Sequence, residues 1–186
     1  MKALDSIRRR LADLPMKRKF LLQATFVAVG IVALAVVAAR VQYLDLTATR
    51  KAAIRDQVDM ALGVIGQYGE LAASGRLDEA TAKAAALQAM RGMHSADGQD
   101  YFFILDTEPR MLMHPTLEGK PLRDVLSADG LAIFPEFVRV GTSGGGYVDY
   151  AWAKAGSEDP VDKSSYAGFY EPWGWVVATG VYLDDT

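Results

Sequence analysis

The sequence contains no cysteine and only two histidines, His94 and His114, among its 186 residues. Disulfides and thiolate metal sites are therefore excluded, and a folded domain must be stabilised by packing alone. Neither histidine lies in an HExxH motif, and the chain has no GxSxG turn and no phosphate loop that opens a helix. We therefore expect neither an enzyme nor a bound cofactor.

Positive charge is scarce in the second half of the chain. From Tyr101 onward the sequence has 13 acidic residues and 6 basic ones, namely Arg110, Lys120, Arg123, Arg139, Lys154 and Lys163. Because phosphate binding needs a basic surface, we expect no nucleic-acid partner. A small anionic ligand is compatible with this composition if a buried cation supplies the local field.

One long stretch has no charge at all, from Phe20 to Ala39. At about 1.5 Å per residue, a helix of this length matches the hydrocarbon core of a bilayer. A cleaved signal peptide is the alternative, since Val37, Ala38 and Ala39 resemble a cleavage site. Its apolar core would be shorter, roughly 7 to 15 residues, and its leader less extended. The pattern therefore favours a transmembrane helix.

Basic residues precede this stretch and set its expected orientation: Lys2, Arg8, Arg9, Arg10, Lys17, Arg18 and Lys19. Positively charged flanks stay in the cytoplasm. The sequence therefore predicts a cytoplasmic leader at 1–19, one span of the inner (cytoplasmic) membrane at 20–40, and an extracytoplasmic, periplasmic domain at 41–186.

Helical periodicity continues beyond the span. Apolar residues recur every three or four positions, at Ile54, Val58, Ala61, Ile65, Tyr68 and Ala72, which predicts a helix ending near Ala73. After a stop at Ser74 and Gly75, Asp78 can cap a second helix with Ala80, Ala84, Leu87 and Met90 on one face. The first stripe could pack against the domain or form the seam of a homodimer.

The pattern changes to strands after a loop around Asp97 and Gly98. Residues 101–105 and 110–114 predict a hairpin, and further strands are expected at 147–152, 164–170 and 175–182. Residues 130–140 have helical spacing, with Pro135 tolerated only in the first turn. The expected fold is α+β, with an antiparallel sheet of about five strands behind a long N-terminal helix.

Two cations of the strand region are candidate ligand-binding residues. Strict alternation places Arg110, Leu112 and His114 on one face of their strand. Burying such groups is costly unless something pairs with them, and a small carboxylate would do so. The alternatives are an internal ion pair of Arg110 with Asp106, Glu108 or Asp149, and a structural role for His114 beside Pro115.

The segment from Lys163 to Tyr166 offers a second set of donors. The ammonium of Lys163, the phenol of Tyr166 and a hydroxyl of Ser164 or Ser165 could hold a carboxylate, although Lys163 could equally be a solvated loop residue. Aromatic residues could wall the pocket and exclude water: Tyr101, Phe103, Tyr150, Trp152 and Trp175.

Taken in order, several strings resemble the single Cache sensor domain of bacterial methyl-accepting chemotaxis proteins: DYFFILD, PRMLMHP, LEGKPLRD, GYVDYAW, KSSY and WGWVVATGVYLDD. The resemblance covers nearly the whole chain. It implies a PAS-like sheet with a long N-terminal helix and a ligand such as acetate, propionate, pyruvate or lactate. It also implies ligand-binding roles for Arg110, His114, Trp152, Lys163 and Tyr166.

The sequence-based hypothesis is therefore a membrane-anchored sensor domain of a chemotaxis transducer that binds a small organic acid, working as a homodimer. The alternatives are the input domain of a sensor histidine kinase or cyclase, a membrane-anchored structural domain without a ligand, and a hydrolase using His114. The sequence ends at Thr186, where the family continues into a second membrane helix and a signalling region. We expect either the sensory piece of a longer receptor or a truncated product that only binds.

Overall fold

The computed structural model describes residues 15–95, 100–154 and 156–183. The chain divides into two compact units, Met1–Asp45 and Leu46–Thr186, which are described separately. Most of the predicted basic leader and the predicted loop at Asp97 and Gly98 lie outside the described residues.

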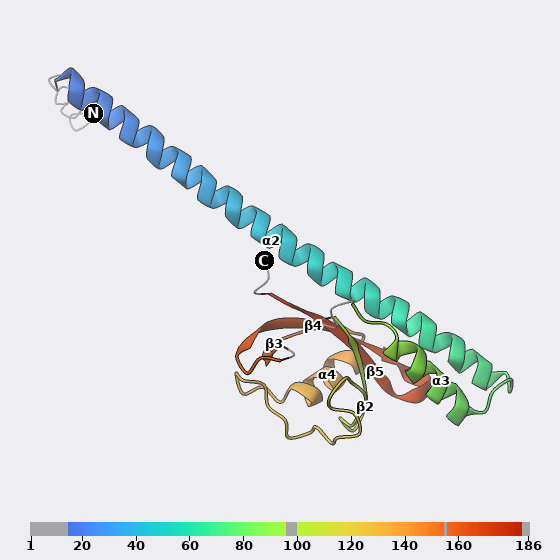
Figure 1. Cartoon of the computed structure of the whole chain (residues 1–186). Helices are drawn as coiled ribbons and strands as arrows, with labels where there is room; N and C mark the ends of the chain where they lie inside the picture. Colours follow the sequence, from blue (N-terminus) through green and yellow to red (C-terminus); the bar gives the residue numbers. More distant parts are fainter. Residues whose placement is uncertain (1–14, 96–99, 155, 184–186) are drawn as a thin grey trace. The chain divides into compact units, whose positions relative to one another are not determined.

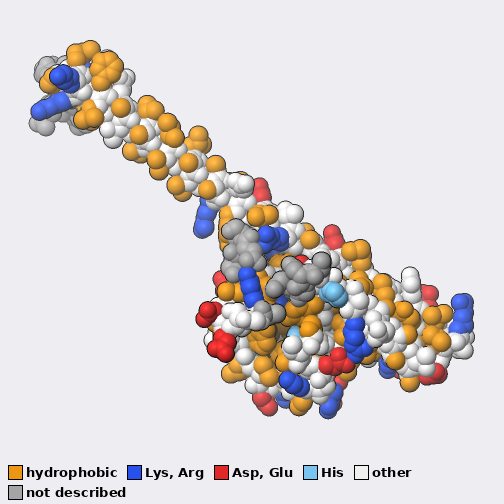
Figure 2. Space-filling view, viewed as in Figure 1, with side chains coloured by type: hydrophobic (Ala, Val, Ile, Leu, Met, Phe, Trp, Pro, Cys, Tyr) orange, Lys and Arg blue, Asp and Glu red, His pale blue; other side chains and the backbone are white. Residues whose placement is uncertain are grey.

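Helix α2, Met16–Ala73, begins in the first unit and continues into the second, so the predicted end near Ala73 is confirmed. Apolar side chains cover its N-terminal part (Figure 2). Within the part of the chain that the structure describes, α2 is the one helix long and apolar enough to cross a membrane, and its most apolar window is not buried.

The second unit is built on one antiparallel sheet (Figure 1). Its strands run in the order β2-β1-β5-β4-β3. Helix α4 covers one face, and the C-terminal part of α2 together with α3 covers the other. The predicted α+β fold with five strands is thereby confirmed. The elements are β1 Phe102–Asp106, β2 Met111–Met113, α4 Ile133–Thr142, β3 Gly146–Ala153, β4 Pro160–Tyr170, the short 3-10 helix η1 Glu171–Trp173 and β5 Trp175–Tyr182.

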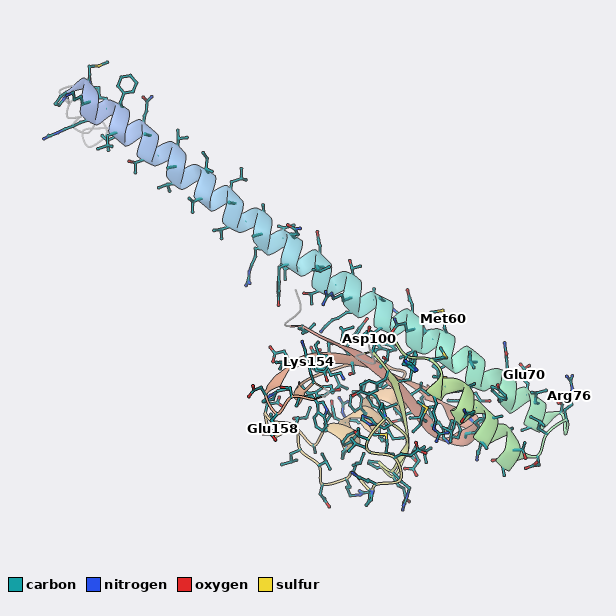
Figure 3. The ribbon with its side chains drawn as sticks, viewed as in Figure 1. Met60, Glu70, Arg76, Asp100, Lys154 and Glu158 are labelled. Carbon is teal, nitrogen blue, oxygen red and sulfur yellow. The ribbon has the colours of Figure 1, made fainter. Side chains whose placement is uncertain are left out.

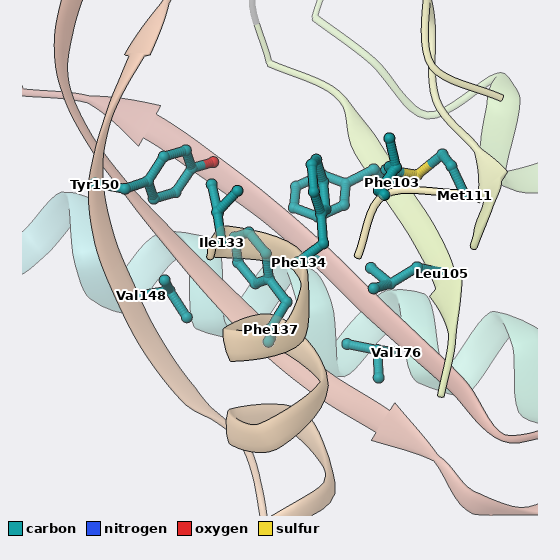
Figure 4. Close-up of a cluster of buried hydrophobic side chains, with 12 residues drawn as sticks. Phe103, Leu105, Met111, Ile133, Phe134, Phe137, Val148, Tyr150 and Val176 are labelled. Carbon is teal, nitrogen blue, oxygen red and sulfur yellow. The ribbon is translucent and has the colours of Figure 1, made fainter. Parts of the chain in front are cut away.

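The face under α4 is an aromatic core (Figure 4). Phe137 is fully buried, and its ring meets those of Phe103 and Tyr150 edge-on at centroid distances of 5.1 and 5.6 Å. Edge-to-face pairs are favoured because the positive edge of one ring meets the negative face of the other. Pro135 lies in the first turn of α4, as predicted, where its missing N–H costs nothing.

The opposite face packs against α2. Ile54, Val58, Ala61 and Ile65 are all buried, so the predicted stripe is used for packing within the domain. Met60, on the other side of the helix, is 61% exposed and points away from the sheet (Figure 3). The stripe that suggested a homodimer is therefore already occupied by the protein's own sheet.

Helix α3, Glu79–Arg91, begins as predicted, with the Asp78 carboxylate accepting a hydrogen bond from the Thr81 amide at 2.9 Å. The predicted face was right only in its C-terminal half. Met90 is buried and Leu87 packs against the core, as predicted, whereas Ala80 and Ala84 are exposed and Ala82 and Ala86 are buried in their place. Alanines at so many positions leave several stripes equally apolar, so the spacing alone could not select the packed one.

The hairpin of β1 and β2 is confirmed, but the predicted alternation along β2 was wrong. Ile104 pairs with Met113 and Leu105 with Met111, so Leu112 is an extra residue in a β-bulge. A bulge reverses the side-chain phase on either side of it. As a result Met111 joins the core under α4, whereas Met113 joins the core under α2. The prediction that Arg110 and His114 lie on one face of this strand therefore no longer follows from the alternation of side chains.

Close packing of α2 on β4 predicts a large effect for Gly168→Ala. A Cβ on Gly168 would lie 2.8 Å from side-chain carbons of both Val58 and Leu62. We expect this variant to lose about 1 to 3 kcal/mol of unfolding free energy through overpacking. Gly63→Ala is the matched control, because its Cβ meets no atom within 4 Å and alanine favours a helix. Urea titration of both variants checks this, and equal stabilities would contradict the contact.

Candidate ligand-binding site

Lys163 lies inside β4, and its residue is only 2% exposed, so the alternative of a solvated loop lysine was wrong. Its Nζ donates to the hydroxyls of Tyr182 and Tyr101 at 3.4 and 3.5 Å, both long hydrogen bonds. The ammonium also lies 4.4 and 4.8 Å from the centroids of these two rings. Among the residues that the structure describes, no carboxylate forms an ion pair with it.

This environment is unfavourable for a charged amine. Burial lowers the pKa of Lys163 from its usual 10.5 to about 8, and the charge of Asp100 only partly opposes the shift. The two phenol acceptors of Lys163 are weak, and no carboxylate among the described residues forms an ion pair with it. An anion at this position would supply a charged partner.

The two tyrosines that flank Lys163 come from different strands. Tyr182 is the direct partner of Lys163 in the register of β4 and β5, and its hydroxyl donates to the carbonyl of Ala153 at 3.1 Å. Burial raises the pKa of Tyr101 to about 12. The phenol of Tyr101 therefore stays protonated at neutral pH and can donate to an anion. Tyr182 was not among the predicted site residues, because only the strand register brings it to Lys163.

His114 follows β2 and faces the same region. Its Nδ1 accepts from the amides of Thr116 and Leu117 at 3.0 and 3.3 Å. Burial, and then the charges of Lys163 and Lys120, lower the pKa of His114 to about 4. The neutral ring therefore carries its proton on Nε2, which makes that atom a donor. The structural role weighed for His114 is present, and its ring also contacts Tyr101 at a centroid distance of 5.1 Å.

A small internal cavity adjoins this cluster. Its volume is about 10 Å³, roughly what the centre of one water molecule requires. Four predicted wall residues line it together with His114 and three residues of α4: Tyr101, Phe103, Tyr150, Trp152, Ile133, Phe134 and Phe137. Figure 4 shows the Tyr150 hydroxyl directed towards the aromatic rings of this cluster. A two- or three-carbon acid could enter only if these side chains move apart.

A larger outer cavity of about 450 Å³ lies between the end of α3 and β2. Tyr101 and His114 line both cavities and so separate them. Arg91 and Glu118, which form an ion pair, also line the outer cavity. Its lining is otherwise largely apolar, including Met90, Met93, Phe102 and Met113.

Three predicted residues are not brought to the cluster. Arg110 is exposed, lines neither cavity and forms none of the ion pairs found among the described residues. Tyr166 packs with the core under α2, because it is three residues from Lys163 and so points to the other face of β4. Trp175 is buried in that same core.

Comparison with known proteins gives consistent matches. Residues 46–186 match the family described as single Cache domain 2. The methyl-accepting chemotaxis protein McpP of Pseudomonas putida is 39% identical over 76% of this chain and 26% of its own length. The sensor histidine kinase MctS of Rhizobium johnstonii is 31% identical over 76% of this chain and 30% of its own length. The chain thus spans less than a third of these curated relatives.

Two solved structures resemble the chain closely. One, described as the periplasmic sensor domain of a chemotaxis protein, is 44% identical with a TM-score of 0.68, covering 73% of this chain and 96% of that one. The other, described in terms of carboxylic acid recognition by a Cache chemosensory domain, is 37% identical with a TM-score of 0.69, covering 74% and 96%. Both similarities extend over nearly the whole of the matched domain.

Proposed function

Because this chain belongs to the single Cache domain 2 family, we propose that it is the ligand-binding sensor domain of a chemotaxis transducer and that it recognises a small carboxylic acid through Lys163. The observation that carries the proposal is the burial of Lys163 without a carboxylate partner among the described residues. A domain without a ligand gains nothing from such a residue, since an apolar side chain of similar size would pack at lower cost.

A carboxylate complements the donors around Lys163. The ammonium forms a charge-assisted hydrogen bond with one oxygen, and the phenol of Tyr101 can donate to either oxygen. Nε2–H of His114 is a further donor, on a ring that contacts Tyr101. The apolar end of the acid then lies among Phe103, the α4 aromatics and Trp152. The small volume of the cavity favours acids of two or three carbons, such as acetate and propionate.

Anchoring in the inner membrane is part of the proposal. The apolar segment of α2 would span the bilayer, the basic residues before it would stay in the cytoplasm, and the sheet unit would be periplasmic. The similarity to the solved periplasmic sensor domain supports this orientation. The homodimer stays a prediction, because the stripe that suggested it packs against the sheet.

The similarity to a sensor histidine kinase favours a second candidate, in which the same sensor controls a kinase. This candidate shares the ligand site and differs only in the output domain. The structural alternative without a ligand required Arg110 and Lys163 to pair with carboxylates, and the described residues contain neither ion pair.

A binding measurement on the full chain in detergent tests the ligand class. We expect acetate and propionate to raise the melting temperature followed by tryptophan fluorescence, because a ligand that binds only the folded state stabilises it. Acetamide and propylamine, which match the acids in size, should cause no shift, because one is neutral and the other repels Lys163. Equal shifts with acids and amides would refute carboxylate recognition.

The control for this measurement is Arg110→Ala. Arg110 is exposed and lines neither cavity, so this variant should keep the shift with acetate and propionate. Loss of the shift in Arg110→Ala would instead move the site to the exposed surface of the β1–β2 hairpin.

A further inference from the structure

Strand β4 has two functional faces. Lys163 lies on the face that contacts Tyr101 and Tyr182, whereas its neighbour Ser164 points to the opposite face. Farther along that opposite face, Gly168 lies against Val58 and Leu62 of α2. The strand that carries the candidate ligand-binding lysine is thus also the strand on which α2 packs.

A polar chain joins the same strand to α2 near the start of the sheet unit. The hydroxyl of Ser164, which is fully buried, donates to Asp149 Oδ1 at 2.5 Å. Lys51 of α2 donates from its Nζ to both oxygens of Asp149, at 2.9 and 3.0 Å. Tyr147 adds a second link, since its hydroxyl donates to the carbonyl of Lys51 at 2.8 Å. We call Ser164, Asp149 and Lys51 the coupling chain.

The ion pair of Lys51 and Asp149 in the coupling chain is too exposed to contribute much to stability. The side chains of Lys51 and Asp149 are 27% and 61% exposed, and such ion pairs contribute little to the folding free energy. Burial raises the pKa of Asp149, but hydrogen bonds from Ser164 and Lys51 outweigh it and hold the pKa below its usual value. Asp149 therefore remains a carboxylate that bridges the sheet and the helix.

Other contacts between β4 and α2 differ in kind from this one. Those around Gly168 are apolar, whereas the coupling chain is directional, since each hydrogen bond depends on distance and angle. Lys163 and Ser164 are joined by one peptide unit. A backbone rotation that moves Lys163 towards an anion therefore also moves the Ser164 hydroxyl, which donates to Asp149. Lys51 lies in the same helix as the apolar segment of α2.

We propose that the coupling chain of Ser164, Asp149 and Lys51 transmits occupancy of the Lys163 cluster to helix α2. This inference rests on the proposed function, since it requires a ligand at Lys163. A ligand can shift α2 only if it binds one arrangement of the chain more tightly than another. Breaking the chain should therefore uncouple the helix from the ligand without removing the ligand site.

The absence of cysteine makes a distance measurement straightforward, because introduced cysteines are the sole labelling positions. Spin labels at Ala53→Cys on α2 and Ser143→Cys after α4 report their separation in the full chain, and both positions are exposed. Propionate is the probe, and its occupancy is followed independently by calorimetry. We expect saturating propionate to shift the distance distribution in the otherwise unchanged sequence.

The decisive variants are Asp149→Asn and Lys51→Met in this labelled background. Both should bind propionate with less than about a tenfold change in affinity, and neither should show the distance shift at saturation. Glu79→Gln is the matched control, since it breaks an exposed ion pair with Lys83 in α3 and should keep the shift.

The outcomes separate the two proposals. A shift that persists in Asp149→Asn and Lys51→Met, or binding without any shift in the unchanged sequence, would overturn the coupling inference and leave the ligand site intact. If the protein without these substitutions bound neither propionate nor acetate nor any other acid, both the proposed function and the inference would be refuted.

Discussion

Lys163→Met is expected to abolish acid binding while making the ligand-free protein more stable. Removing one partner of a buried charge pair costs roughly 2 to 5 kcal/mol, so affinity for propionate should fall at least about 30-fold. At the same time methionine fills a similar volume without a buried charge. Calorimetry measures propionate binding, and thermal unfolding measures stability, in both the unsubstituted protein and Lys163→Met.

The stabilisation follows from the pKa of Lys163. Folding lowers this pKa from 10.5 to about 8, so between these values the unfolded chain binds more protons and stability rises with pH. Below pH 8 the folded protein bears the full penalty of the buried ammonium, of the order of 3 kcal/mol. Lys163→Met removes that penalty and should raise the melting temperature by roughly 10 °C.

A purely structural lysine would behave in the opposite way. If Lys163 stabilised the fold through Tyr101 and Tyr182, Lys163→Met would lower the melting temperature. Lys120→Met is the control for removing a positive charge as such, because Lys120 is exposed and should change neither binding nor stability appreciably. A destabilised Lys163→Met that still bound propionate would contradict the proposed site.

The second large effect is a loss of acid affinity at alkaline pH. In the ligand-free protein the pKa of Lys163 is about 8, whereas a carboxylic acid is ionised at every pH above 6. Above pH 8 a carboxylate must therefore bind with uptake of a proton, and its affinity should fall by up to about tenfold per pH unit. Between pH 7 and 10 the total decrease should approach 100-fold.

Calorimetry in buffers of different ionisation enthalpy detects that proton directly. At pH 9 we expect nearly one proton to be taken up per propionate bound, and at pH 6.5 almost none. His114 does not contribute in this range, because its pKa is about 4 and the ring stays neutral. Proton uptake that is absent at pH 9 would mean that the acid does not pair with Lys163.

The elements of the fold were predictable because their signals are local. The cap at Asp78 and the apolar stripe from Ile54 to Ile65 each specify a helix from neighbouring residues. Strand β5 was expected at 175–182 and occupies Trp175–Tyr182. What local signals could not supply was side-chain phase, which the β-bulge at Leu112 changed and which the alanines of α3 left ambiguous.

The composition of the site was predictable only in part. The resemblance implied Lys163, His114 and Trp152, and Tyr101, Phe103 and Tyr150 were predicted as aromatic walls. The structure places these residues in the Lys163 cluster or around the small cavity beside it. Tyr182 was missed because its contact with Lys163 depends on the register of two strands. Tyr166 was included because sequence proximity was given more weight than alternation, which puts it on the other face.

The structure of the acid-bound protein tests the central claim most directly. With propionate bound, we expect a carboxylate oxygen within about 2.7 to 3.2 Å of Lys163 Nζ, with the phenol of Tyr101 as a further partner and the ethyl group among the α4 aromatics. Propionate in the outer cavity between α3 and β2, with Lys163 still contacting only the two phenols, would contradict the account.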